Sequence, residues 1–207
     1  MSTTTTTTVS MPPPTRREEV KLAIDGGRGI AGMLLFVATE SFLFVLMFFA
    51  YFYLAEGGWR WLSVSPPDLL LPTIMMVVLI GSGFVASWGG RQIKNGHSER
   101  ARWASAGVIL LGLLFLALQS LSYAQGWSKV TPRSNVYGSL FYTITVIHCA
   151  HIIVGLMILG YVLILPQVEP TVRLPHRPYR NAAIYWYFCI ILFACIYGLL
   201  YVLPNAR

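Results

Sequence analysis

Three ionisable side chains lie well inside long apolar stretches of the sequence: Glu40, His148 and His151. A charged carboxylate in the middle of a membrane costs about 2.5 to 3.5 kcal/mol on insertion scales, so such a group must be protonated, paired or functional. Glu40 is therefore either a neutral carboxyl that hydrogen-bonds between helices, or a site for a proton, an ion or a lipid headgroup. We predict that it pairs with one of the two histidines, because each partner relieves the burial cost of the other.

The two histidines are three residues apart, which places them on the same face of a helix. Buried histidines of this kind commonly form hydrogen bonds between helices. The pair cannot hold one haem, because axial ligands approach the iron from opposite faces, and a two-histidine metal site would need further ligands from facing helices. Another apolar stretch carries three polar side chains, those of Gln119, Ser122 and Tyr123. The sequence thus predicts an intramembrane polar network formed by Glu40, Gln119, His148 and His151.

Other catalytic and metal-binding patterns are absent from the sequence. It contains no nucleophile–base pair, phosphate-binding loop or dinucleotide fingerprint, so we predict no catalytic residue and no bound metal. Cys149, Cys189 and Cys195 lie within apolar stretches without the spacing of metal ligands. They are predicted to be packing residues.

The composition predicts a membrane protein that is entirely helical. Apolar residues make up 56% of the chain and charged residues only 11%, whereas soluble domains carry about 25% charged residues. The apolar residues form five blocks, at about 30–54, 69–88, 103–123, 136–165 and 182–203. The first block would span roughly 37 Å as a helix, enough to cross a hydrocarbon core of about 30 Å with some tilt. We therefore predict a bundle of five transmembrane helices.

Proline and threonine mark the boundaries of this bundle. Pro166 and Pro204 are predicted to end the fourth and fifth helices, because proline cannot continue the backbone hydrogen bonds. Residues 1–20 form a tail rich in threonine and proline that is predicted to be disordered in the cytoplasm. Residues 21–207 are predicted to form the transmembrane domain. Close helix contacts are expected at small residues, namely Gly81, Ser82, Gly83, Ser87, Gly155 and Gly160.

The net charge of +7 sets the orientation of the helices and does not indicate nucleic-acid binding, because the basic residues stand in short clusters between the apolar blocks. Eleven of the 15 Lys and Arg fall on one side of the predicted membrane. The positive-inside rule places that side, with the N-terminus, in the cytoplasm and the C-terminus outside. Four arginines on the cytoplasmic side are candidates to hold lipid phosphates: Arg28, Arg100, Arg102 and Arg180.

Four segments resemble the subunit III family of haem–copper oxidases. The fourth block resembles the family's T-G-x-H-x-x-H-x-x-x-G signature at Thr145, His148, His151 and Gly155. The first block resembles its G-x-x-x-F-x-x-S-E-x-x-x-F segment, with Glu40 at the glutamate. The third resembles its G-x-x-F-x-x-x-Q-x-x-E-Y segment at Gly112, Phe115, Gln119 and Tyr123, and the fifth begins, as the family's does, with Tyr185-Trp186. The resemblance covers nearly all of residues 25–203.

This chain has fewer polar residues at its predicted interior positions than the family pattern has. Six positions depart from it: Thr39 for serine, Pro72 for asparagine, Val146 for glycine, Tyr187 for histidine, Ile190 for aspartate and Phe193 for tryptophan. Ser122 also stands where a carboxylate is frequent.

The resemblance implies an accessory subunit without redox centres of its own. Such a chain packs on subunit I, which carries the haem and copper, beside subunit II and other respiratory subunits. It binds phospholipid and supports proton uptake and stability of a complex that passes electrons from cytochrome c or a quinol to oxygen while translocating protons. The expected location is a bacterial plasma membrane. Three alternatives stay open: a subunit of a nitric oxide reductase or other respiratory assembly, a small channel or transporter, and a redox protein built on His148 and His151.

Overall fold

The computed structural model of the chain describes residues 16–56, 68–127, 131–133, 135–168 and 176–206. Every element in these ranges is a helix: α1 (Arg16–Glu56), α2 (Leu70–Lys94), α3 (Ser98–Gly126), α4 (Val136–Val168), α5 (His176–Tyr197), the π-helix η1 (Gly198–Val202) and the short α6 (Leu203–Ala206). Five stretches are long and apolar enough to cross a membrane: Arg28–Glu56, Leu70–Lys94, Ser98–Gly126, Val136–Ile164 and Pro178–Asn205. The predicted all-helical, five-span architecture is confirmed. Which side faces the cytoplasm stays a prediction.

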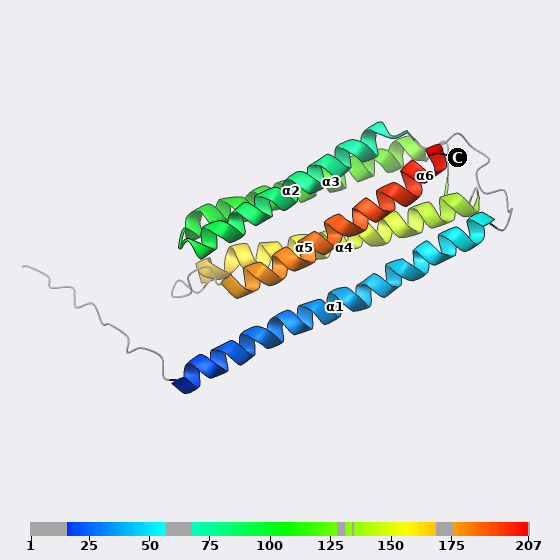
Figure 1. Cartoon of the computed structure of the whole chain (residues 1–207). Coiled ribbons are helices and arrows are strands. Elements are labelled where there is room, and N and C mark those ends of the chain that lie inside the picture. The colour runs from blue at the N-terminus through cyan, green and yellow to red at the C-terminus, as the bar shows by residue number, and fades with distance from the viewer. Residues whose placement is uncertain (1–15, 57–67, 128–130, 134, 169–175, 207) are drawn as a thin grey trace, which may run out of the picture.

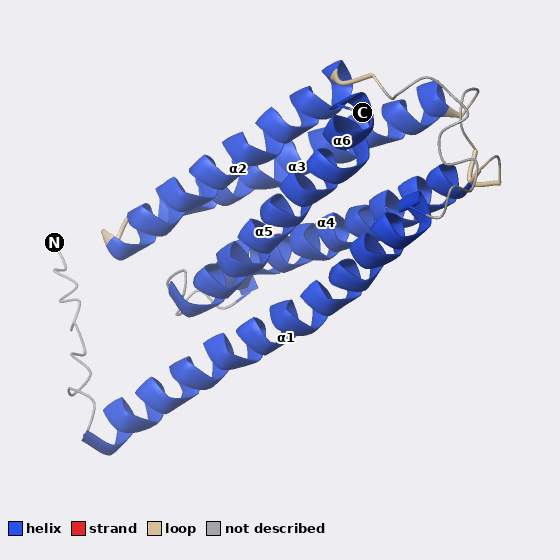
Figure 2. Ribbon diagram, turned by 45° about the vertical axis from the view of Figure 1, so that its right-hand side comes forward, coloured by secondary structure: helices blue, strands red, loops and turns tan. Residues whose placement is uncertain are grey.

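The helices form three layers, with α2 and α3 on one side, α4 and α5 in the middle and α1 on the other side (Figure 1). Figure 2 shows the same order after a turn of 45°. Within the layers, α5 packs against α1, α2 and α4. Half of the most apolar stretch of α5 is buried inside the protein, against 6% of that of α1. The central helix is therefore α5, and α1 is a peripheral helix with a largely exposed apolar surface.

A tight turn joins α2 to α3. Gly96 has a φ of 79°, in the left-handed region that glycine adopts without steric cost. The backbone N–H of Gly96 bonds to the carbonyl of Ile93 at 3.0 Å, and that of His97 bonds to Gln92 at 2.9 Å. These bonds cap the end of α2, so α3 returns directly alongside it.

Aromatic side chains of α5 pack on the backbone of α2 where α2 carries small residues. The Tyr179 hydroxyl donates to the carbonyl of Ala86 at 2.8 Å, and the Tyr187 hydroxyl donates to the carbonyl of Gly83 at 3.0 Å. The indole N–H of Trp186 donates to the Ser82 hydroxyl at 2.9 Å. The predicted small-residue contact thus holds at Ser82 and Gly83, whereas Gly81 has open space around it.

On α4 the two predicted glycines also differ. A Cβ atom on Gly155 would lie 3.0 Å from the Trp186 ring, whereas one on Gly160 would meet nothing within 4 Å. A side chain at position 155 would therefore crowd Trp186, while position 160 has open space.

The predicted helix ends at prolines are wrong. Pro166 lies inside α4, which continues to Val168, and Pro204 lies inside α6. Proline removes one backbone N–H, so near a helix end it costs a single hydrogen bond while the neighbouring residues keep helical dihedrals. Proline is also tolerated in the first turn of a helix, where the N–H has no intrahelical partner, as at Pro72.

The predicted boundary of the N-terminal tail also needs correction. Residues 16–20, which were included in the disordered segment, are already part of α1. Residues 16–24 contain no proline or glycine to interrupt a helix. The helix then continues through Gly26 and Gly27 into the apolar block. The rest of the predicted tail, residues 1–15, lies outside the described residues.

Gly89 offers a test of the α2–α3–α5 packing. A Cβ atom there would overlap the Tyr179 hydroxyl and lie 2.7 Å from the Cβ of Ala104. We expect Gly89→Ala to lower stability by about 1–3 kcal/mol, the usual cost of overpacking, measured as a lower apparent melting temperature in detergent. The matched control is Gly81→Ala in the same helix, which meets open space and is expected to leave the melting temperature unchanged or slightly raised. Equal effects of the two changes would contradict this packing.

Candidate functional site: a part-buried carboxyl–imidazole pair

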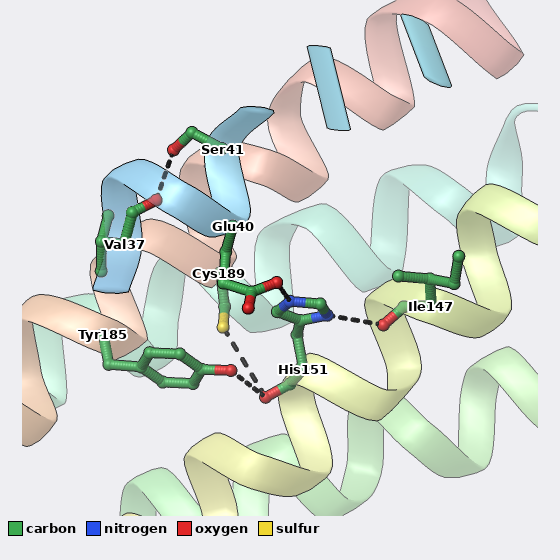
Figure 3. Close-up of polar contacts among 7 residues, drawn as sticks. All are labelled: Val37, Glu40, Ser41, Ile147, His151, Tyr185 and Cys189. Carbon is green, nitrogen blue, oxygen red and sulfur yellow. Dashed lines mark hydrogen bonds and ion pairs between the residues drawn. The ribbon is translucent and has the colours of Figure 1, made fainter. Parts of the chain in front are cut away.

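Glu40 of α1 and His151 of α4 are in direct contact inside the bundle (Figure 3). The carboxylate Oε2 lies 3.1 Å from the imidazole Nε2, and the side chains of Glu40 and His151 are 26% and 11% exposed. The structure therefore shows the predicted pairing, and it selects His151 as the partner.

A second hydrogen bond fixes the orientation of the His151 ring. Its Nδ1 lies 2.8 Å from the backbone carbonyl of Ile147. A carbonyl oxygen only accepts, so Nδ1 carries a hydrogen and donates it. The remaining nitrogen, Nε2, then either accepts from a protonated Glu40 or, as an imidazolium, donates to the carboxylate. In both states one proton lies between the two side chains, and the pair can hold or exchange it without leaving either group unpartnered.

The pair also ties α1 and α4 to α5. The Tyr185 hydroxyl donates to the backbone carbonyl of His151 at 3.2 Å, and the thiol of Cys189 lies 3.9 Å from the same oxygen. Both residues lie beside the pair in Figure 3. The rings of Phe44 and Phe188 stand edge-on to the imidazole, with centroids at 5.2 and 6.3 Å. Three helices therefore meet at the pair, within a mainly aromatic shell.

His148 does not join this pair in any described contact. Its ring lies between Phe193, stacked at 5.4 Å, and Phe115, edge-on at 5.7 Å. Both ring nitrogens are buried and have no hydrogen-bond partner among the described residues. The two histidines share the predicted helix face, but His151 meets α1 whereas His148 is held between α3 and α5.

Gln119 is likewise buried on α3, and its amide nitrogen has no partner among the described residues. The described contacts therefore join only Glu40 and His151 of the four predicted network residues. Tyr201, whose hydroxyl is buried beside Gln119 and Ser122, was not among the predicted network residues. A tyrosine near the end of an apolar block normally suggests an interface residue, so the sequence carried no clear signal for it.

The four arginines predicted to hold lipid phosphates lie at one end of the bundle. Arg28 begins the membrane-spanning part of α1, Arg180 lies in the first turns of α5, and Arg100 and Arg102 lie in the first turns of α3. The amide of Asn181 donates to the carbonyl of Gly29 at 3.3 Å, which brings the Arg28 and Arg180 positions together. Arg28, Arg100 and Arg180 are exposed and Arg102 is partly buried.

The described residues contain no group of three or more His, Cys, Asp or Glu side chains arranged to hold a metal ion. His148 is enclosed by aromatic rings, and both nitrogens of His151 already have partners. The residues described here therefore do not fit a haem or copper site.

Comparison with known proteins shows the family to which the chain is related. The profile of the family described as cytochrome c oxidase subunit III matches residues 21–204. The chain belongs to this family. The cytochrome c oxidase subunit 3 of Cyprinus carpio is 31% identical over 179 residues, and those of Gallus gallus and Xenopus laevis are 30% identical over 178 residues. Each match covers 82% of this chain and 67% of the relative.

Membership of the subunit III family confirms the resemblance inferred from four short segments. The match also includes α2, where the sequence analysis found only a departure, Pro72, from the family pattern. The Glu40–His151 contact joins two of the segments that carried the resemblance, the first and the fourth.

Substitutions at the pair test whether it holds α1 to the bundle. We expect Glu40→Leu and His151→Leu each to lower stability by about 1–3 kcal/mol or more, because each leaves a polar group buried without its partner. The double variant should lose clearly less than the sum of the two single losses. The measurement is the apparent melting temperature of the purified full-length chain.

Ser41→Ala provides the control. Ser41 is next to Glu40 in the chain, but its hydroxyl bonds back to Val37 of its own helix at 2.7 Å (Figure 3). This change should have little effect. Strictly additive losses at Glu40 and His151 would show that the contact contributes nothing to stability.

Proposed function

We propose that this chain is an accessory, non-catalytic subunit of a respiratory haem–copper terminal oxidase, which passes electrons from cytochrome c or a quinol to oxygen and translocates protons. The observation that carries the proposal is the subunit III family match across residues 21–204. The buried ionisable side chains support the non-catalytic part, because Glu40 and His151 are paired with one another and His148 is enclosed by aromatic rings. Haem and copper belong to a partner chain, subunit I.

The exposed apolar surface of the bundle supports packing on such a partner. Large side chains of α1 lie open along the helix, among them Leu35, Phe42 and Phe49, each at least two-thirds exposed. In a membrane this surface meets either lipid or another helix. We propose that subunit I, with subunit II and other chains of the complex, covers part of the bundle and that phospholipid covers the rest.

The physical role that we propose follows from this placement. A rigid bundle beside the catalytic subunit keeps lipid in place and keeps the water access of a proton entry point steady, and so supports proton uptake and stability of the complex. The excess of basic residues on one side supports an orientation with the N-terminus in the cytoplasm. The proposed location is the plasma membrane of a bacterium, in which the chain is a multi-pass protein.

Co-purification tests the proposal. The tagged full-length chain, extracted in mild detergent from its own membrane, should bring with it a larger membrane protein that carries haem, seen by its absorption spectrum, and copper, seen by metal analysis. The identity of that catalytic chain distinguishes a terminal oxidase from a nitric oxide reductase. Recovery of a stable homo-oligomer with ion flux, or of haem bound to this polypeptide itself, would overturn the proposal.

The arginine cluster yields a separate prediction. A guanidinium and a lipid phosphate form strong charge-assisted hydrogen bonds. Replacing Arg28, Arg100, Arg102 and Arg180 together by alanine should therefore reduce the phospholipid that the purified complex retains, measured by quantitative lipid mass spectrometry. Arg133→Ala is the control, since this exposed residue precedes α4 at the opposite end of the bundle. Unchanged bound lipid in the four-residue variant would discard the lipid assignment.

A further inference from the structure

Three almost completely buried polar side chains carry atoms without a hydrogen-bond partner among the described residues: His148 is 1% exposed, and Gln119 and Tyr201 are each 2% exposed. Four of their polar atoms lack a hydrogen-bond partner among the described residues: Nε2 of Gln119, Nδ1 and Nε2 of His148, and the hydroxyl of Tyr201. A buried polar group without a partner is costly, and nearly all such groups in folded proteins are bonded either to protein or to ordered water.

These groups converge where α3, α4 and η1 meet. The Tyr201 hydroxyl lies beside Gln119 and Ser122, and the Tyr201 ring packs on Phe141 of α4. His148 immediately precedes Cys149 on α4, and its ring touches Phe115, which is one helical turn from Gln119 on α3. Gln119 and Tyr201 therefore lie side by side, and His148 lies near them on α4; these three side chains are called the α3–α4–η1 cluster.

The backbone at the cluster departs from α-helical geometry. Gly198–Val202 is a π-helix, in which the N–H of Leu203 bonds to the carbonyl of Gly198, and it is the only such segment in the described ranges. Single π-helical turns occur frequently at functional sites. Here the turn carries Tyr201 inward and offers the carbonyl of Leu200 to the hydroxyl of Tyr137 at 2.7 Å. The irregular turn thus coincides with the unpartnered groups.

The chemistry of the four atoms selects the ligand. The amide nitrogen of Gln119 needs acceptors, while a neutral imidazole needs one acceptor and one donor, and a phenol can use either. An anion offers no hydrogen to the unprotonated nitrogen of His148. A metal cation accepts nothing from the Gln119 amide or the His148 N–H. Water both donates and accepts, and buried waters typically make about three hydrogen bonds to groups of this kind.

We propose that the α3–α4–η1 cluster is a binding site for buried water, with Gln119 and Tyr201 sharing at least one molecule and His148 bonding to the same or the next one. The site is separate from the Glu40–His151 pair. Phe44 and Phe188 flank the pair, whereas Phe115 and Phe193 flank His148.

A density map of the full-length chain, purified with the chains that accompany it, tests the proposal directly. At a resolution that shows other buried waters, we expect solvent density at hydrogen-bond distance, about 2.6–3.2 Å, from at least two of the three side chains. Side chains that instead bond directly to one another, with no density between them, would overturn it. An empty site at that resolution would do the same.

Thermal unfolding gives a second, independent measurement. Gln119→Met and Tyr201→Phe each remove one of the water's partners while nearly keeping the side-chain volume. We expect each to lower the apparent melting temperature by a few degrees, and the double variant to lose less than the sum, because both act on one bound molecule. Tyr161→Phe is the control, since Tyr161 is 63% exposed on α4, and it should change nothing.

Thermal unfolding also has an outcome that contradicts the proposal. If the two atoms bind nothing, removing them relieves an unmet burial cost, so both single variants would match or exceed the control in melting temperature and their effects would add. That result would overturn the proposal. Where a variant fails to fold, the density map of the unmodified protein still decides.

Discussion

A carboxyl group in the apolar middle of a helix has to find its partner inside the protein, because lipid offers none. In this protein Glu40 finds it in His151, and the arrangement of the outer helix depends on that contact. Only 6% of the most apolar stretch of α1 is buried, so side-chain burial alone attaches α1 weakly to the rest. The imidazole also donates to the carbonyl of Ile147, and the His151 carbonyl accepts from Tyr185. The polar contacts of the single residue His151 therefore connect α1, α4 and α5.

The layer formed by α2 and α3 is held to α5 by a different kind of contact. Between helices in lipid the hydrophobic effect gives little net attraction, so close packing and hydrogen bonds must hold them together. Small residues of α2 expose its backbone, and Tyr179 and Tyr187 of α5 donate hydrogen bonds to backbone carbonyls there, while Trp186 donates to the Ser82 hydroxyl. The central helix α5 therefore joins two halves that are stabilised in different ways, by backbone contacts toward α2 and by a side-chain pair toward α1 and α4.

Much of this arrangement could be predicted from the sequence, because a bilayer imposes strong rules. Hydropathy was sufficient for the five spans, and burial cost was sufficient to pair Glu40 with a histidine. The choice between His148 and His151 could not be predicted, since helical spacing places both on one face and only the rings of Phe115 and Phe193 decide between them. Nor could spacing separate Gly155, where a Cβ atom would crowd Trp186, from Gly160, where a Cβ atom would meet open space.

The long separation between Glu40 and its partner, 111 residues along the chain, has a consequence for biosynthesis. Ribosomes add about 5–20 residues per second, so α1 enters the bilayer on the order of ten seconds before α4 arrives. During that interval the Glu40 carboxyl has no imidazole partner. The first helix inserted is thus among the last to be secured, and a nascent chain truncated before α4 would leave it undocked and open to quality-control proteases.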